Sequence, residues 1–296
     1  MKKVIVYFRY HEERDYKYLS EVINVLTGSD YQIYLPADLP VALPDIFARK
    51  MVCHTYTGYE DIPKDAELFI TYGGDGTILR AATIIRDSGI PIFGINAGRL
   101  GFLAYIPKEN AVQAVKKYLN GDFYIQARSL LSVSAKENGL FGKNLNFALN
   151  ELTISRKNTT SMINVDVYIN DEFLSTYWSD GLIVSTPTGS TGYSMSCGGP
   201  ILTPDTQDFI INAIAPHNLT VRPLVLPNHN TIKLVPQGRE KEVLVSLDSR
   251  VMSIPSGLEL EIVKAPFKIN FIQIEDYTFI KTLRRKLFWG YDNRNT

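Results

Sequence analysis

The sequence predicts an α/β domain with a doubly wound parallel sheet, a mostly β second domain, and a C-terminal helix that packs back on the first domain. Three observations support this fold class. Short apolar runs alternate with helical patterns as far as Phe123, which is typical of a parallel sheet. Many short β-like runs, separated by turn signals, follow up to Ile274 and indicate a sandwich of sheets. Helical spacing then returns. The predicted domains are 1–123, 124–274 and 275–296.

In the first domain, each expected strand is a short apolar run and each expected helix repeats apolar residues on one face. The expected strands are Val4 to Phe8, Tyr31 to Leu35, Glu67 to Ile70 and Ile90 to Asn96. The expected helices are Asp15 to Leu26, Ile78 to Arg86 and Asn110 to Leu119. The segment from Phe47 to Glu60 fits neither pattern.

The second domain is predicted from runs of β-forming residues between turn signals. These runs are Leu130 to Ala135, Asn146 to Ser155, Asn164 to Ile169, Leu182 to Ser185, Thr231 to Leu234, Glu242 to Leu247, Leu258 to Val263 and Lys268 to Ile274. The final helix is expected from Thr278 to Trp289, and the last residues, Asp292 to Thr296, are expected to be loose.

Composition excludes several classes of function. Lys plus Arg and Asp plus Glu both number 31, so the net charge is zero and no global attraction to nucleic acid or an anionic membrane is expected. No apolar run approaches the roughly 20 residues that cross a bilayer. The cysteines, Cys53 and Cys197, have no CxxC spacing, which argues against a zinc site or a disulfide framework. A cytoplasmic protein is the simplest expectation.

A glycine stretch, Thr71 to Thr77, lies between an expected strand and an expected helix. Glycines allow the backbone to approach a ligand closely, and the N-terminus of the following helix presents free N–H groups suited to phosphate. Asp75 stands in the middle of this stretch, where its charge repels phosphate. It can therefore be expected to hold a metal or to accept a proton. The alternative is a plain hairpin turn.

The apolar residues change parity across Asn150 and Glu151, from positions 145, 147 and 149 to positions 152 and 154. A strand of period two cannot do this without an extra residue, so the pattern predicts a β-bulge that aims side chains at a site. The alternative is a strand that passes from one sheet to the other at a corner. An amide beside a carboxylate suits hydrogen bonding to a ribose or a base.

Nearly every residue from Ser185 to Ser196 is a hydroxyl-bearing residue or a glycine. Such a stretch offers many neutral hydrogen-bonding groups, and Tyr193 could stack on a base or sugar. It has no lysine, so it is not a Walker-type P-loop. The alternatives are a flexible linker and, for Asp180-Gly181, a hairpin turn. Arg250 could clamp phosphate or be a turn residue, and of the four histidines only His217 is retained as a possible ligand contact.

At these residues the sequence resembles the NAD kinase family over nearly its whole length. The resemblance rests on four motifs in order: Gly73-Gly74-Asp75-Gly76-Thr77; Gly94-Ile95-Asn96 with Leu100-Gly101-Phe102-Leu103; Asn150-Glu151; and Asp180-Gly181 through Thr186 to Ser194. The first motif also occurs in diacylglycerol and sphingosine kinases. One small departure is Gly192, where many members carry Ala.

The resemblance implies transfer of the γ-phosphoryl group of ATP to the 2′-hydroxyl of the adenosine ribose of NAD, which gives NADP. It makes Asp75 the base facing that hydroxyl. Asn150 and Glu151 would bind the nicotinamide or ribose side, or the phosphate donor and metal, while Asp180 would hold the nicotinamide amide. The implied nucleotide contacts are Gly74, Asp75, Gly76, Arg80, Asn150, Glu151, Asp180, Thr191, Gly192, Tyr193, Ser194, Met195, Ser196 and Ala215.

The resemblance further implies Mg²⁺ or Mn²⁺ carried mainly by the phosphates of ATP, without a dedicated protein metal site. It implies a homodimer or homotetramer in which a neighbouring subunit supplies some contacts. Two alternatives stay open on the residues. One is a lipid or sugar kinase that shares the glycine stretch, and the other is a regulatory module that binds NAD or NADP without transfer.

Overall fold

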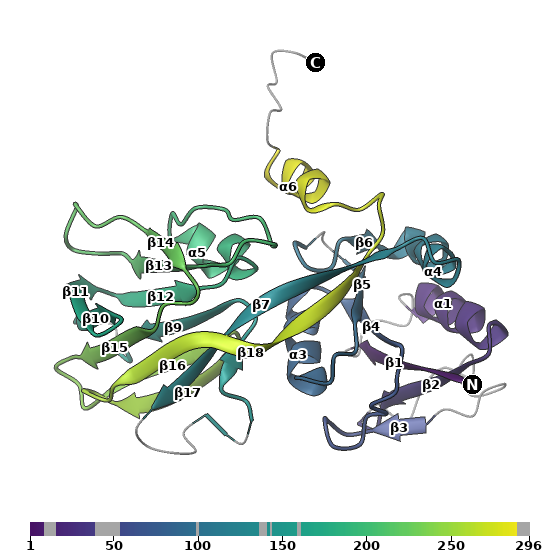
Figure 1. Ribbon diagram of the computed structural model, residues 1–296, viewed down its shortest axis with the longest axis horizontal. Coiled ribbons are helices and arrows are strands. Elements are labelled where there is room, and N and C mark those ends of the chain that lie inside the picture. Colours follow the sequence, from purple (N-terminus) through teal and green to yellow (C-terminus); the bar gives the residue numbers. More distant parts are fainter. Residues whose placement is uncertain are drawn as a thin grey trace, which may run out of the picture. The chain divides into compact units, whose positions relative to one another are not determined.

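A computed structural model of the chain describes residues 1–8, 16–38, 54–98, 101–135, 141–142, 144–158 and 161–288. The chain divides into two compact units, drawn in Figure 1. The first unit comprises Met1–Ala127 and Ile269–Thr296, and the second comprises Arg128–Lys268. The expected loose end, Asp292 to Thr296, lies outside the described residues. None of the helices in the described ranges has the length and apolar character needed to cross a membrane.

The first unit is built on a parallel sheet. Its strands are β1 (Lys2–Phe8), β2 (Tyr31–Pro36), β3 (His54–Tyr56), β4 (Leu68–Gly73), β5 (Ile92–Asn96) and β6 (Ile106–Pro107). They run in the order β5-β4-β1-β2-β3, with β6 beside β5, and every pairing is parallel. The central strands are buried on both faces, which is why they read as continuous apolar runs.

Helices cover both faces of this sheet, as the doubly wound prediction requires (Figure 1). The helices α1 (Tyr16–Gly28) and α4 (Ala111–Leu119) contact each other and share one apolar core with the sheet, while η2 (Lys108–Asn110) leads into α4. The helix α3 (Asp75–Ile85) contacts β1, β4 and β5 but contributes nothing to that core, so it lies on the opposite face.

The C-terminal helix α6 (Phe279–Leu287) belongs to the first unit, as expected. The Thr278 hydroxyl accepts a hydrogen bond from the backbone N–H of Lys281 at 3.2 Å and caps the helix. The ring of Phe279 lies 6.4 Å from the ring of Phe102, measured between centroids. The helix therefore packs on the segment that follows β5.

The second unit contains two packed sheets that are mainly antiparallel. Its strands are β7 (Tyr124–Ala135), β8 (Phe147–Ala148), β9 (Glu151–Ser155), β10 (Ile163–Ile169), β11 (Glu172–Ser179), β12 (Gly181–Ser185), β13 (Asp208–Ile214), β14 (Leu224–Pro227), β15 (Ile232–Gln237), β16 (Glu242–Leu247), β17 (Arg250–Pro255) and β18 (Leu260–Gln273). The residues of β7 up to Ala127 and those of β18 from Ile269 belong to the first unit, where β18 pairs with β5. One sheet has the order β14-β13-β12-β9-β16-β17. The other carries β11-β10-β15-β18, with β7 paired to β18 and β8 paired to β7. One apolar cluster draws residues from both sheets, as in a sandwich.

The run from Asn146 to Ser155 is not one bulged strand. It forms β8, which pairs with β7 in one sheet, and β9, which pairs with β12 and β16 in the other. Leu149 and Asn150 lie between them, and the segment 149–151 is called the corner below. The change of parity therefore marks a change of sheet, which was the alternative reading, and the predicted bulge is wrong.

Other boundaries also differ from the expectation. The helix α3 begins at Asp75, inside the glycine stretch, so the motif is largely the first turn of a helix. The stretch from Ser190 to Ile201 is not a flexible linker, because η3 (Gly189–Thr191) and α5 (Tyr193–Ser196) form two short helical turns in it. The two runs from Leu258 to Ile274 join as β18. The sequence did not predict β3, β11, β13, β14 or β17.

Replacing Gly181 with Ala should destabilise the second unit. A Cβ atom at this position would lie 2.3 Å from the carbonyl oxygen of Ile154, which is rigid backbone in the neighbouring strand. We expect a loss of about 1–3 kcal/mol in the free energy of unfolding, measured by chemical denaturation. The control is Gly238→Ala, where the nearest atom would be 3.4 Å away. Equal stability of the two variants would contradict the expectation.

Candidate active site

In the first unit, the predicted site residues gather at the N-terminus of α3. Gly74 is the N-cap, and Asp75 is the first residue of the helix. Gly74 and Gly76 are exposed, and a Cβ atom at either would meet nothing within 4 Å. The N–H groups at the start of a helix have no partner within it, so this end of α3 can receive an anion such as phosphate.

The Asp75 carboxylate is held by the backbone after β5. Its Oδ2 accepts the N–H of Phe102 at 2.8 Å, and its Oδ1 accepts the N–H groups of Leu103 and Ala104, both at 3.0 Å. Gly101 must be a glycine for this contact, because a Cβ atom there would lie 1.9 Å from Oδ1. Asn96 donates to the carbonyl oxygen of Ala104 at 2.9 Å and so fixes the same loop from β5.

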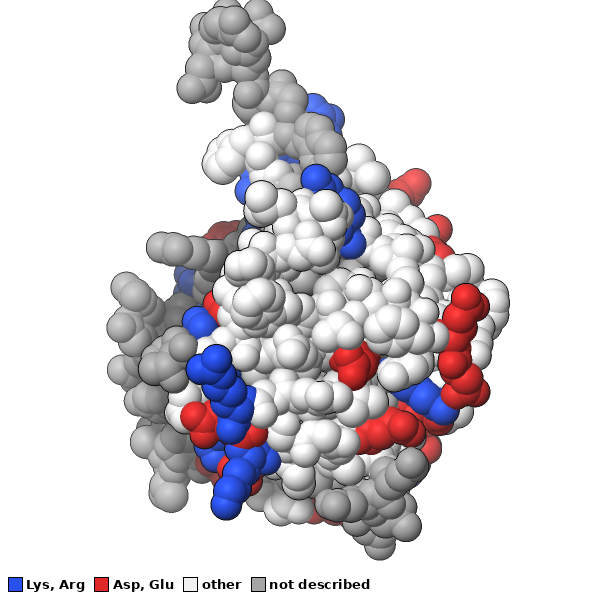
Figure 2. Space-filling model, turned by 90° about the vertical axis from the view of Figure 1, so that its left-hand side faces the viewer, with Lys and Arg blue, Asp and Glu red and all other residues white. Residues whose placement is uncertain are grey.

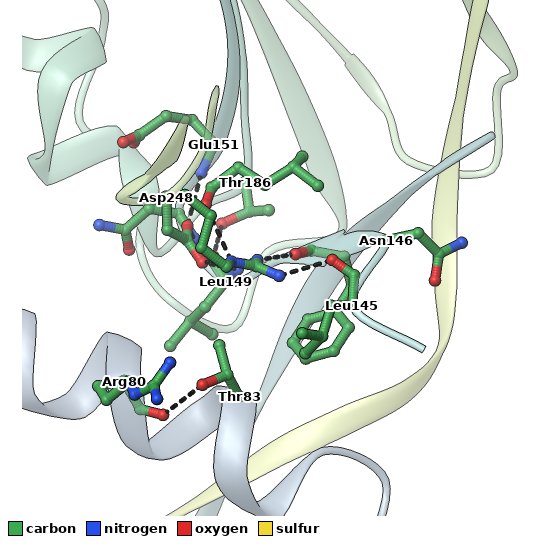
Figure 3. A network of polar contacts seen from close by, with 12 residues as sticks. Arg80, Thr83, Leu145, Asn146, Leu149, Glu151, Thr186 and Asp248 are labelled. Carbon is green, nitrogen blue, oxygen red and sulfur yellow. Dashed lines mark hydrogen bonds and ion pairs between the residues drawn. The ribbon is translucent and has the colours of Figure 1, made fainter. Parts of the chain in front are cut away.

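One acceptor position of Asp75 stays available. Each carboxylate oxygen can accept about two hydrogen bonds. Among the described residues, Oδ1 receives two from the loop, whereas Oδ2 receives one. Asp75 is only half-buried, so a hydroxyl group can approach Oδ2. Arg80, one turn along α3, has an exposed side chain, and its carbonyl oxygen accepts the Thr83 hydroxyl at 2.8 Å (Figure 3).

In the second unit, the corner presents Asn150 and Glu151, of which Figure 3 labels Glu151. The side-chain oxygen Oδ1 of Asn150 and the oxygen Oε2 of Glu151 are both buried, and neither has a hydrogen-bond partner among the described residues. Buried polar atoms in native proteins nearly always have a partner. Two orphaned oxygens on adjacent residues are therefore the clearest sign of a ligand in this unit.

The Ser/Gly stretch packs directly on the corner. A Cβ atom at Gly189 would lie 2.2 Å from the carbonyl oxygen of Asn150, so only glycine fits there. A Cβ atom at Gly192 would lie 3.1 Å from Oε2 of Glu151 and 3.4 Å from the side-chain nitrogen of Asn150. The structure thus brings Gly192 and its neighbour Tyr193, whose ring is 46% exposed, beside the orphaned oxygens.

The remaining predicted residues of this stretch are exposed to different degrees. Thr191 and Met195 are half-buried and Ser196 is exposed. Ser194 is fully buried, and its carbonyl oxygen and hydroxyl both accept the side-chain amide of Asn212, at 2.9 and 3.3 Å. Ser194 therefore ties α5 to β13 rather than facing open space.

Burial sets the protonation of Glu151. Desolvation and, to a lesser extent, the negative charge of Asp248 raise the pKa of the Glu151 carboxyl to about 8, against the lowering effect of the backbone N–H of Tyr193. Burial also raises the pKa of the Asp248 carboxyl, although its backbone donors and Arg250 oppose that rise.

A second group of predicted residues lies at the opposite end of β12. Asp180 precedes β12, and its carboxylate forms an ion pair with Arg156 at 2.9 Å. Its backbone N–H donates to Ile214 at 3.0 Å, which places it beside the exposed Ala215, whose φ of 45° is unusual for a residue with a side chain. His217 packs on Trp178, with ring centroids 4.2 Å apart.

The predicted residues therefore fall into three groups: Asp75 and its neighbours in the first unit, the corner with Gly192 and Tyr193 in the second, and Asp180 with Ala215. In the second unit, Ser185 pairs with Glu151 and Gly181 pairs with Ser155, so the full length of β12 separates its two groups. Five residues of strand span roughly 16 Å.

Sequence reasoning assigned no holding role to four residues that keep these groups in place. Asn96 and Thr186 were only members of the motifs, and Arg156 and Asp248 were not site candidates. Asp248 lies 97 residues from Glu151 along the chain, so no local pattern could join them. The sequence signal that could have identified Asp248 is a single carboxylate directly after an apolar strand.

The oxygens of the corner suit a hard cation. Mg²⁺ prefers oxygen ligands and keeps several waters, so the orphaned oxygens of Asn150 and Glu151 fit it chemically. Within the described ranges, no group of three or more His, Cys, Asp or Glu side chains could hold a metal ion.

Two family models match the chain. The ATP-NAD kinase N-terminal domain matches residues 6–123, and the ATP-NAD kinase C-terminal domain matches residues 149–274. Together they cover both the glycine stretch and the corner. The chain belongs to the ATP-NAD kinase family. The predicted family and the predicted class of enzyme, a kinase that acts on NAD, are thereby confirmed.

Relatives and solved structures agree. The chain is 48% identical over 296 residues to an NAD kinase of Flavobacterium psychrophilum, covering 99% of this chain and 100% of that protein. It is 45% identical over 293 residues to an NAD kinase of Flavobacterium johnsoniae, with the same coverage.

Among solved structures, an NAD kinase from Archaeoglobus fulgidus in complex with ATP has a TM-score of 0.75 at 25% identity and covers 97% of this chain and 99% of that one. Yeast NADH kinase complexed with NADH has a TM-score of 0.86 at 24% identity, covers 100% of this chain and 90% of that one, and supports the fold. The predicted fold class is confirmed.

Replacing Glu151 with Gln should change how stability depends on pH. The raised pKa means that the folded state holds this proton in a range where the unfolded chain has lost it, from the ordinary value of 4.5 up to about 8. Stability should therefore fall as pH rises through this range, and Glu151→Gln should remove that fall. Melting temperatures of both proteins near about pH 5 and about pH 9 test this. Parallel curves would contradict the raised pKa.

Proposed function

We propose that the chain transfers the γ-phosphoryl group of ATP to the 2′-hydroxyl of the adenosine ribose of NAD and releases NADP and ADP. The observation that carries this proposal is the first turn of α3, where free N–H groups suited to phosphate lie next to a carboxylate with one open acceptor position. A phosphate seat and a base on the same turn suit transfer to a hydroxyl group.

In the proposed mechanism, Asp75 Oδ2 accepts the proton of the ribose 2′-hydroxyl. A bond forms between the ribose oxygen and the γ-phosphorus, and the bond from that phosphorus to the bridging oxygen of ADP breaks. The loop N–H groups of Phe102, Leu103 and Ala104 keep the carboxylate in place, because its remaining positions are already bonded. The chain's main contribution is positioning, as in other phosphoryl transfers.

We assign the dinucleotide contacts by their place in the structure. The corner and Gly192, with the half-exposed Tyr193 ring, suit the adenosine half through hydrogen bonds and stacking. The Asp180 carboxylate suits the nicotinamide amide. The ion pair with Arg156 holds that carboxylate in one orientation.

The proposed cofactor is Mg²⁺ or Mn²⁺ that arrives with ATP. When bound, such a cation neutralises charge on the donor phosphates. The side-chain oxygens of Asn150 and Glu151 are the groups that would complete its coordination, since both lack partners. A cytoplasmic location stays a prediction from composition.

The test uses purified chain, ATP, Mg²⁺ and NAD, with NADP detected by an NADP-specific dehydrogenase. Formation of NADP supports the proposal. NAD binding without NADP would favour a regulatory module, and transfer to a diacylglycerol, sphingoid base or sugar phosphate instead would favour the other kinase class. NADH offered in parallel shows which redox form is preferred.

Asp75→Asn should lower kcat by about 10²–10⁴-fold, because a positioned general base is lost. The variant should still fold and bind NAD, since its amide oxygen can keep the N–H groups of Leu103 and Ala104 and only the bond to Phe102 is lost. The measurement is NADP formation beside NAD binding by calorimetry. Turnover close to that of the unmodified chain would remove Asp75 from the role of base.

We further propose that the chain forms a homodimer or homotetramer through the outer surface of β11. This strand is at the edge of its sheet and exposes Phe173 (55%), Leu174 (39%) and Trp178 (50%). Figure 2 shows the face on which β11 lies, and uncharged residues cover most of its centre. The register against β10 shifts between Val167 and Tyr168, so side chains rather than strand addition would form the contact.

Phe173→Ser with Leu174→Ser should reduce the mass in solution toward the 33.4 kDa of one chain. The reason is loss of apolar surface from the proposed contact. Light scattering over a range of concentrations measures the mass. Ile280→Ser is the matched control, because Ile280 is 54% exposed on α6. An unmodified chain that stays monomeric at every concentration would contradict the proposal.

A further inference from the structure

The corner is a place where the backbone leaves one sheet for another. The strand β8 ends at Ala148 and β9 begins at Glu151, and the two pair in different sheets. The N–H and carbonyl groups of the residues between them have no strand ladder to satisfy them. Buried groups of this kind need other partners.

Asp248 supplies the partners for the N–H groups. Its Oδ2 accepts the N–H of Leu149 at 3.1 Å, and its Oδ1 accepts those of Asn150 at 2.8 Å and Glu151 at 3.3 Å (Figure 3). Its own N–H donates to the carbonyl oxygen of Glu151 at 3.0 Å. The Asp248 side chain is only 3% exposed, so these bonds are shielded from water.

Thr186 supplies the partners for the carbonyl groups. Its hydroxyl donates to Leu149 at 2.6 Å, and its backbone N–H donates to Asn150 at 2.8 Å. Asp248 thus accepts hydrogen bonds from the N–H groups of the corner, and Thr186 donates hydrogen bonds to its carbonyl groups. The side chains of Asn150 and Glu151 take no part in these bonds, which leaves their oxygens directed elsewhere.

Arg250 fixes the strand that enters the corner. Its guanidinium group donates to the carbonyl oxygens of Leu145 at 2.6 Å, of Phe147, and of Leu247 at 3.2 Å. It lies 3.8 Å from the Asp248 carboxylate and 5.3 Å from the centre of the Phe147 ring. The sequence left two roles open for Arg250, a phosphate clamp and a turn residue. In the structure, the guanidinium group of Arg250 instead donates to backbone carbonyl oxygens.

We propose that Asp248 is a positioning residue for phosphoryl transfer: it holds the backbone of the corner so that Asn150 and Glu151 meet the nucleotide in one fixed orientation. Arg250 supports it by fixing β8 and by compensating the buried charge. The inference rests on the proposed roles of Asn150 and Glu151. A buried carboxylate with several charge-assisted hydrogen bonds gives the stiffness that positioning needs.

The experiment compares Asp248→Asn with Val167→Ala. Asn keeps the size of the side chain but presents an N–H₂ group to backbone donors, so the corner loses at least one bond and its fixed orientation. Val167 is fully buried in the apolar core of the same unit, on β10, and is not one of the predicted site residues. Val167→Ala therefore serves as the control for a general loss of stability.

For Asp248→Asn we expect kcat/KM for NAD to fall about tenfold or more, mainly through a higher KM with a smaller change in kcat. Val167→Ala should lower the melting temperature and leave KM unchanged. If Asp248→Asn lowers only the melting temperature, as Val167→Ala does, the proposal is overturned.

Two further variants keep the proposal testable. If Asp248→Asn does not fold, Arg250→Lys is the second variant. It keeps the positive charge but loses the several N–H donors of the guanidinium group, so it should raise KM for NAD while the protein still folds. An unchanged KM overturns the proposal.

Asn150→Ala tests the role on which the inference rests. If Asn150→Ala raises KM while Asp248→Asn does not, positioning fails and the proposed function stands. If Asn150→Ala has no effect, the assigned role of the corner fails first.

Discussion

Two carboxylates in this structure accept hydrogen bonds from consecutive backbone amides, and the site residues depend on that interaction. In the first unit, Asp75 binds the N–H groups of residues 102–104. In the second unit, Asp248 binds those of residues 149–151. In each case the backbone has just left a strand and has no ladder partner. A charged acceptor satisfies the donors, and the donors in turn offset the cost of partly or fully removing the charge from water.

The two carboxylates nevertheless have different roles. Asp75 is half-buried and keeps one acceptor position, so the loop that holds it also leaves it able to react. Asp248 is almost fully buried, and its contacts are with the chain itself. In the proposed mechanism, this contact presents the base in one unit and fixes the backbone under the nucleotide-binding side chains in the other.

The sequence predicted the parts of the fold that depend on local pattern. The strands of the parallel sheet are buried on both faces, so they appear as apolar runs, and α1 and α4 show one buried face each. The start of α3 was placed too late, because Gly74 and Gly76 are poor helix formers and their conformation depends on the Asp75 contact with a distant loop.

The parts that were missed depend on contacts between distant residues. The change of parity at Asn150 and Glu151 correctly marked an irregularity. Whether it was a bulge or a corner was decided by β7, β12 and β16, which pair with β8 and β9. The strand β13 was missed because Asn212 interrupts its apolar pattern, and the structure buries that amide against Ser194. Asp248 is the clearest case, since its partners lie 97 to 99 residues away.

The irregular edge of β11 bears on how copies of this chain can associate. A flat apolar edge strand can add identical strands without limit, and such growth leads to fibres. In β11 the register against β10 slips beside Phe173 and Leu174, so the outermost backbone cannot template a long, regular ladder. The same apolar side chains stay exposed on its surface. Contact through side chains alone permits a closed, symmetric assembly and opposes open-ended polymerisation.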